Sequence, residues 1–233
     1  MRIAVDLHIH SALSPCADDD MTPNNIVNMA ILKKLDVISI TDHNSCDNVE
    51  AVIKAADSRL IVVPGMEVQT REEVHLLCYF SWLDKLMDFE EVINNKLPNI
   101  SNVPKIFGNQ LIIDDEDKVV GVRDEMLISS TDLSIDQIIE EVWSRNGVVI
   151  PAHVDRPSYS VISQLGFIPH TLEDGMVEIS DYKNELLRQY PSHKLLYSSD
   201  AHELGQILER VSFLTVWDLS VSGILKALRN PSK

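Results

Sequence analysis

The chain has 233 residues, of which 45% are hydrophobic, and its formal net charge is −16. This length supports one domain with a full core, and the excess of acidic residues argues against an extended nucleic-acid face, because such a face needs clustered Lys and Arg. No run approaches the roughly 20 apolar residues of a membrane span, and the first apolar run starts at Ile3, which leaves no room for a signal peptide. We therefore expect a cytoplasmic protein without a membrane partner. Its three cysteines lack the spacing of a disulfide framework or a zinc knuckle, so we expect free thiols.

The first predicted strand ends in a pair of histidines. It starts at Ile3 and leads into the hexapeptide Asp-Leu-His-Ile-His-Ser at residues 6–11. Successive side chains of a strand point to opposite faces, so His8 and His10 share a face and can present two imidazoles to one metal ion. Taken alone, such a pair is also typical of hydrogen-bonded core histidines, so the interpretation depends on the rest of the chain.

Later apolar runs with strand character also carry residues that bind divalent metals. The candidate ligands are Asp42 and His43 after residues 37–40, Glu67 after 60–65, His75 near the start of 74–80, His153 after 147–151, and Asp200 and His202 after 195–199. Together with His8 and His10, six of the eight histidines lie on apolar runs or just after them, whereas chance would scatter them over helices and loops. His170 and His193 do not follow the pattern, and we expect them in loops or at the surface.

Predicted helices alternate with these strands. Thr22 is a favourable N-cap followed by Pro23 at the first helical position, and further helices are predicted at residues 47–56, at 135–145 with Ser134 as the cap, and at 221–228. Strands that are nearly continuous in Val, Ile and Leu are buried on both faces, which indicates a parallel sheet that is covered by helices or closed into a barrel. We favour the barrel, because its functional sites lie at the C-terminal ends of the strands, where the candidate ligands fall.

In combination and order, these motifs resemble the PHP (polymerase and histidinol phosphatase) family. They are residues 6–11, Thr-Asp-His-Asn at 41–44, Gly-Met-Glu at 65–67 with His75, Ala-His at 152–153 and Ser-Asp-Ala-His at 199–202. The resemblance implies an α/β fold in one domain over residues 1–233, a distorted (β/α)7 TIM-like barrel with its metal site at the C-terminal ends of the strands. It also implies a metal-dependent phosphoesterase with two or three divalent ions of Zn, Mn or Fe. The substrate would be a small phosphorylated metabolite or a nucleotide, attacked by a water or hydroxide that bridges two ions.

The resemblance also implies the metal ligands. It assigns His8, His10, Glu67 and Asp200 to one ion, Glu67, His75 and His153 to a second, and His43 and His202 to a third. The remaining ligand of the third ion is an Asp or His in the loop before a Thr-Pro or Ser-Pro pair, and counting back from residues 22–23 gives Asp18. Residues 14–17 lengthen this loop, so Asp19 and Cys16 stay open as alternatives.

Glu67 and Asp42 are the candidate catalytic residues. Glu67 would bridge two ions, while Asp42 would orient a neighbouring ligand or hydrogen-bond a bound water. Arg156 is placed to bind the substrate phosphate through two parallel hydrogen bonds, and Arg71 is a second candidate; a salt-bridged surface arginine is the alternative for both. The sequence has no Gly-rich phosphate loop and no Gly-x-Ser-x-Gly elbow, so we expect water to be the nucleophile.

Residues 84–145 match none of these motifs and form a predicted insertion. One hypothesis is a cap that selects the substrate; a packing subdomain or a dimer contact stays open, as does the oligomeric state. For the function, the alternative is an amidohydrolase-like hydrolase of C–N bonds, whose bridging group is typically a carboxylated lysine. Glu67 in that position favours the phosphoesterase. A non-catalytic barrel would predict a degraded ligand set, which this sequence does not have.

Overall fold

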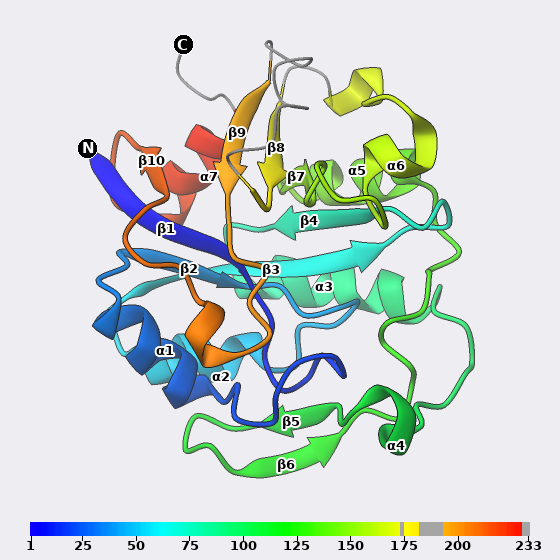
Figure 1. The fold of residues 1–233 in the computed structure, drawn as a ribbon, viewed down its shortest axis with the longest axis horizontal. Helices are drawn as coiled ribbons and strands as arrows, with labels where there is room; N and C mark the ends of the chain where they lie inside the picture. The colour runs from blue at the N-terminus through cyan, green and yellow to red at the C-terminus, as the bar shows by residue number, and fades with distance from the viewer. Residues whose placement is uncertain (173–174, 182–192, 230–233) are drawn as a thin grey trace.

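A mixed six-stranded sheet, curled into half a barrel, forms the centre of the molecule (Figure 1). The computed structural model describes residues 1–172, 175–181 and 193–229. The sheet has the order β10-β1-β2-β3-β4-β7, with bounds β1 (Arg2–Ile9), β2 (Val37–Ile40), β3 (Ile61–Gln69), β4 (His75–Tyr79), β7 (Val148–Pro151) and β10 (Phe213–Thr215). Two further strands, β8 (Met176–Ile179) and β9 (Lys194–Tyr197), pair in parallel beside β7.

The directions of the strands differ in part from the predicted parallel sheet. Strands β1, β2 and β3 are parallel, whereas β4 is antiparallel to both of its neighbours and β10 is antiparallel to β1. The physical reason is the short connection at residues 70–74, because a parallel crossover requires a dozen or more residues. The start of β4 therefore meets the C-terminal ends of β1 to β3. The α/β class is confirmed, while the count of seven βα units stays a prediction.

Both faces of the sheet are buried, as its apolar strands predict. On one face, a core cluster joins the sheet to α1 (Pro23–Leu32), α2 (Val49–Ala56), α3 (Leu83–Asn94) and α5 (Ile135–Ser144). On the other face, a second cluster includes α7 (Val221–Arg229). Shorter helical elements are α4 (Pro104–Phe107), α6 (Val161–Leu165) and two 3-10 turns at His170–Leu172 and Leu204–Gln206.

Two predicted helix caps have different outcomes. Ser134 caps α5 through a reciprocal capping box: its hydroxyl accepts from the Gln137 N–H at 3.3 Å, and the Gln137 side chain accepts from the Ser134 N–H at 2.9 Å. Helix α1 begins at Pro23 as predicted, but the Thr22 hydroxyl makes no capping bond. Within the described ranges, every helix is too short or too polar to cross a bilayer.

The predicted insertion at residues 84–145 contains two helices, α3 and α5, that pack into the core. Between them, β5 (Leu111–Ile113) and β6 (Val119–Val122) form a hairpin that lies beside the loop after β1 (Figure 1). The Leu111 N–H donates to the Ala12 carbonyl at 2.8 Å, and the Asn48 side chain donates to the Leu111 carbonyl at 3.0 Å. The hairpin therefore supports the loop that carries residues 11–20. The single-domain division and the cap hypothesis stay predictions.

Candidate metal centre

Eight of the nine predicted metal ligands gather at one end of the curled sheet. His8 and His10 lie at the end of β1, His43 follows β2, Glu67 lies in β3, His75 starts β4, His153 follows β7, and Asp200 and His202 follow β9. His75 reaches this end because β4 runs antiparallel to β3. The segment after β9 returns to β1, where the His10 N–H donates to the Ala201 carbonyl at 2.9 Å. Residues from distant parts of the chain therefore meet in one cluster.

Glu67 lies at the middle of the cluster with a side chain that is 1% exposed. Its Oε1 lies 3.0 Å from His75 Nδ1 and 3.3 Å from both His8 Nε2 and His153 Nε2. Its Oε2 lies 2.9 Å from His43 Nδ1. One carboxylate thus contacts imidazoles from four separate strands or strand ends, which is the geometry that a bridging ligand requires.

A second set of contacts centres on Asp200. Its Oδ1 lies 3.1 Å from His8 Nε2 and 3.0 Å from His10 Nε2, and these two nitrogens are 3.1 Å apart. Zn–ligand bonds of about 2.0–2.2 Å place neighbouring ligand atoms of a tetrahedral site roughly 3.3 Å apart. The three atoms are therefore spaced as ligands of one ion would be.

The buried donors lack ordinary hydrogen-bond partners. Five atoms of the cluster are buried and make no hydrogen bond: both oxygens of Glu67, Oδ1 of Asp200 and the Nδ1 atoms of His43 and His153. Some of them nevertheless lie close to another polar atom, as Glu67 Oε2 does to His43 Nδ1 and Asp200 Oδ1 does to His8 Nε2. An unsatisfied buried polar group costs about 1–3 kcal/mol in stability. Several such groups in one place therefore indicate a site that binds a cation. Imidazole and carboxylate donors at these spacings fit divalent cations such as Zn, Mn or Fe.

Opposing charges shift the acid–base equilibria inside the cluster. Burial lowers the pKa of His8, but the facing carboxylates, Glu178 first, outweigh it and raise this pKa well above its usual value. Burial raises the pKa of Glu67, but the surrounding imidazoles, His75 first, hold it well below its usual value. Burial and two neighbouring imidazoles lower the pKa of His10. These interactions favour the ionised form of Glu67, which is the form that binds cations.

A third group consists of His10, His43 and His202, whose ligand atoms lie within 4.8 Å of one another. Cys16 Sγ lies 3.1 Å from His202 Nε2. Partial burial raises the pKa of this thiol, but the charge of His43 and hydrogen bonds with both histidines outweigh it and lower the pKa to about 6. Asp18 is exposed, and its backbone N–H donates to the His202 carbonyl at 2.9 Å. Neither its carboxylate nor the Cys16 sulfur belongs to the candidate ligand groups found among the described residues.

Two buried carboxylates orient the histidines from behind. Asp42 accepts from the Ser14 hydroxyl at 2.7 Å, and this hydroxyl lies 2.9 Å from His10 Nδ1. Glu178, which the sequence analysis missed, has both oxygens 3.0 Å from His8 Nδ1 and accepts from the His153 N–H at 2.9 Å. A charged residue inside the apolar strand β8 was the available signal. Such partners fix the tautomer and the direction of a metal-binding imidazole.

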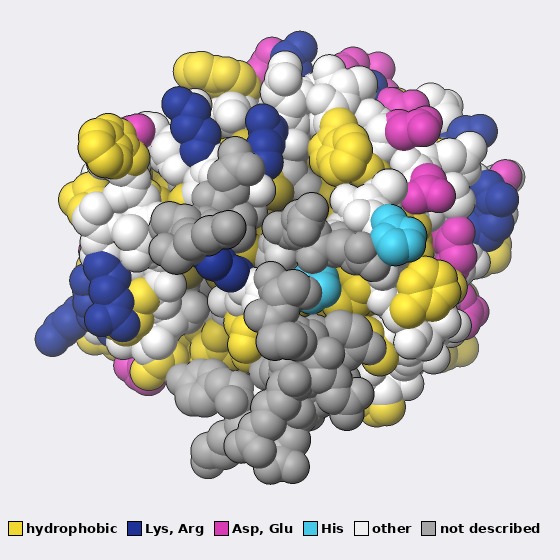
Figure 2. Space-filling model, turned by 90° about the horizontal axis from the view of Figure 1, so that it is seen from above, with side chains coloured by type: hydrophobic (Ala, Val, Ile, Leu, Met, Phe, Trp, Pro, Cys, Tyr) yellow, Lys and Arg dark blue, Asp and Glu magenta, His cyan; other side chains and the backbone are white. Residues whose placement is uncertain are grey.

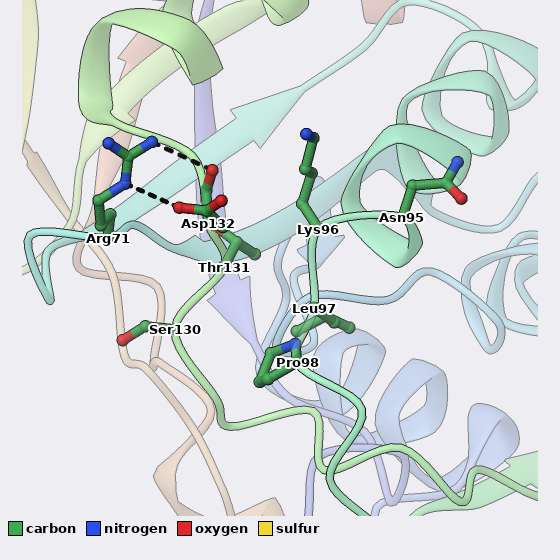
Figure 3. Close-up of a pocket in the computed structure, with 8 residues that line it drawn as sticks. All are labelled: Arg71, Asn95, Lys96, Leu97, Pro98, Ser130, Thr131 and Asp132. Carbon is green, nitrogen blue, oxygen red and sulfur yellow. Dashed lines mark hydrogen bonds and ion pairs between the residues drawn. The ribbon is translucent and has the colours of Figure 1, made fainter.

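The two predicted phosphate-binding arginines lie in different places. Arg156 forms an ion pair with Asp200 and lines a hollow of about 120 Å³ at the cluster, together with Ser158 and Tyr159. Arg71 lies in a separate cavity of about 460 Å³, where it pairs with Asp132 at 3.0 Å (Figure 3). Only Arg156 therefore reaches the cluster itself.

Comparison with known proteins identifies the family. The PHP domain model matches residues 6–217. The chain belongs to the PHP domain family. This match confirms the resemblance read from the motifs, and with it the predicted class of metal-dependent hydrolase. The chain is also 27% identical to the uncharacterized protein MJ0043 of Methanocaldococcus jannaschii over 163 residues. The matched region is 70% of this chain but only 18% of that relative.

Several solved structures share the fold of this PHP domain. The lesion-specific endonuclease PfuEndoQ from Pyrococcus furiosus is 20% identical with a TM-score of 0.75, and endonuclease Q in complex with a 27-mer duplex bearing an abasic lesion gives 0.73. The chain is covered to 98% in both cases and spans 56% of each endonuclease chain. Two further structures are more distant. A proposed metal-dependent phosphoesterase from Bifidobacterium adolescentis is 18% identical with a TM-score of 0.55, over 86% of this chain and 88% of that one. An amidohydrolase from Chromobacterium violaceum is 15% identical with a TM-score of 0.57, over 99% of both chains.

The likeness to a DNA endonuclease corrects one prediction. The exclusion of an extended nucleic-acid face was wrong, because endonuclease Q combines this fold with a duplex DNA substrate. Net charge was a poor guide, since it averages over the whole surface. On the face shown in Figure 2, Lys and Arg side chains lie mainly in the left half and Asp and Glu mainly toward the right and the upper edge. Local patches can therefore differ in sign from the total charge of −16.

Proposed function

We propose that this PHP domain is a metal-dependent phosphoesterase that hydrolyses phosphodiesters of nucleic acid. The observation that carries the proposal is the buried carboxylate of Glu67, which lies among imidazoles from β1 and β4 and from the segments that follow β2 and β7. We propose two or three ions of Zn, Mn or Fe. The ligands would be His8, His10, Glu67 and Asp200 for one ion, Glu67, His75 and His153 for a second, and His43 and His202 for a third. When bound, the ions lower the pKa of water and neutralise charge on the phosphate.

The protein side chains prepare this site in three ways. Glu178 accepts the Nδ1 proton of His8, which leaves Nε2 free as a ligand atom, and Asp42 acts on His10 through the Ser14 hydroxyl. These bonds hold the rings in place, so little reorganisation is needed when substrate arrives. Arg156 would exchange its contact with Asp200 for the substrate phosphate once a cation takes over that carboxylate.

Tyr159 supports a nucleic-acid substrate. The residue is 44% exposed at the hollow, and its ring stacks on His75 with a centroid distance of 4.8 Å. An exposed aromatic ring beside a phosphate site provides a surface on which a base can stack. The fold similarity to endonuclease Q points to the same substrate class. The chain spans 56% of endonuclease Q, so the rest of that protein has no counterpart in the comparison.

The alternative function, an amidohydrolase-like hydrolysis of C–N bonds, has a structural neighbour in its favour. Its typical bridging group, a carboxylated lysine, has no counterpart here, since no lysine among the described residues lines the hollow. Glu67 occupies the central position instead. The donor set therefore supports phosphate chemistry.

The test is a hydrolysis assay of the full chain loaded with Mn or Zn. Substrates are duplex and single-stranded oligonucleotides with and without an abasic site, bis-p-nitrophenyl phosphate, p-nitrophenyl phosphate and a panel of amides. We expect cleavage of oligonucleotides and of the diester, and its loss in Glu67→Gln with retention in Glu50→Gln, an exposed position on α2. Activity on amides alone, or activity that Glu67→Gln leaves intact, would refute the proposal.

A further inference from the structure

The group formed by His10, His43 and His202 lacks an assigned anionic ligand. The first two histidines are buried, and His202 lies at the rim of the cluster. His202 Nδ1 faces the Asp200 carbonyl at 2.8 Å, so this nitrogen carries the proton and Nε2 keeps its lone pair. A second ligand atom should therefore lie in the direction of Nε2.

The atom in that direction is the sulfur of Cys16. Its Sγ lies 3.1 Å from His202 Nε2. The other two candidates from the sequence contact different partners. The Asp18 backbone N–H donates to the His202 carbonyl, and the Asp19 carboxylate accepts from the Asn109 side chain at 2.8 Å, whereas Cys16, which is also exposed, reaches His202 with its side chain.

The loop that carries Cys16 is held in place from both sides. Its Ala17 N–H donates to the Ser14 carbonyl at 2.9 Å, and the Ser14 hydroxyl belongs to the Asp42 network. From outside, Gly108 approaches so closely that an added Cβ would lie 1.9 Å from the Pro15 carbonyl oxygen. These contacts hold the backbone on both sides of Cys16 in place.

We propose that the Cys16 thiolate is a ligand of the ion held by His43 and His202, in place of the carboxylate or imidazole expected there. The inference rests on the proposed metal centre and adds a donor to it. A thiolate with two imidazoles is a softer set than the mixed imidazole and carboxylate sets of the other two positions, so this position should select Zn over Mn. The chain would then hold two kinds of divalent site side by side.

The test uses Co²⁺ as a spectroscopic substitute for the ion in the full chain. Cobalt bound by any ligands gives visible d–d bands, whereas a thiolate ligand adds a charge-transfer band in the near ultraviolet. We expect this band in the native protein, its loss in Cys16→Ala and Cys16→Asp, and its retention in Asp18→Asn and in Cys46→Ser, where the serine can still donate to Glu90. Zn content should fall by about one ion per chain in Cys16→Ala and recover in Cys16→Asp.

The outcomes separate the two proposals. Visible bands without the charge-transfer band in the native protein, or a band that survives Cys16→Ala, would overturn the thiolate ligand and leave the metal centre intact. The absence of any cobalt binding would overturn both. Alkylation by iodoacetamide gives an independent measurement: Zn should protect Cys16 from modification, and equal labelling with and without Zn would contradict the inference. Circular dichroism of each variant verifies the fold.

Discussion

Replacing Glu178 by glutamine should weaken metal binding without unfolding the protein. Both oxygens of Glu178 lie 3.0 Å from His8 Nδ1, and one of them also accepts from the His153 N–H at 2.9 Å. In Glu178→Gln one of these acceptors becomes a donor, and the negative charge that faces His8 is lost. Substitution of such partners typically costs 10- to 100-fold in metal affinity, or about 1.4–2.7 kcal/mol. We expect a loss in this range.

The assay is a competition titration of Zn against a chromophoric chelator, performed on the native protein and on Glu178→Gln at one pH. Glu50→Gln is the matched control, because Glu50 pairs with Lys54 on an exposed helix face where the side chains are 54% accessible. This control should bind Zn as the native protein does, since an exposed ion pair contributes little. A Glu178→Gln protein with native Zn affinity would refute the role of this carboxylate in orienting His8.

Three further predictions concern substrate binding, packing and the thiols. Tyr159→Ala should raise KM for oligonucleotides more than for bis-p-nitrophenyl phosphate, because only the former has bases to stack; equal changes in steady-state kinetics would contradict this. Gly65→Ala should destabilise the protein by about 1–3 kcal/mol in urea unfolding, because the new Cβ would lie 2.4 Å from the Ser39 hydroxyl; native stability would show that this contact relaxes. Burial raises the pKa of Cys46 and Cys78, so both should stay protonated and unreactive toward Ellman's reagent up to pH 8, and only the exposed Cys16 of the metal-free chain should react; two or three rapidly reacting thiols would show that burial does not protect Cys46 and Cys78.

The local patterns predicted the strands and the positions of the candidate ligands along them. The alternation that places His8 and His10 on one face is a property of every strand, and the cap at Ser134 needs only four consecutive residues, so both could be read from the sequence. Apolar runs ending in polar residues likewise indicated where the chain crosses the site. Each of these patterns depends only on residues that are close together in the sequence.

Features that depend on distant partners could not be predicted in the same way. Glu178 lies 170 residues from His8, and no local pattern links the two. The reversed direction of β4 depends on the length of the connection at residues 70–74, which the count of strands did not take into account. The charge argument failed for a related reason, since a total over 233 residues carries no information on where the charges lie.

The backbone explains how one carboxylate can serve several imidazoles. Residues after β2 continue beside β3: the Glu67 N–H donates to the Asp42 carbonyl at 3.1 Å, and the Asn44 N–H donates to the Glu67 carbonyl at 2.8 Å. His43 is therefore held opposite Glu67 by main-chain hydrogen bonds that do not depend on the side chains. On the other side, β4 pairs with β3 in antiparallel register, which brings His75 to the same end. A fully parallel neighbour would have placed the start of that strand at the opposite edge, so the mixed sheet is what allows Glu67 to lie between the two histidines.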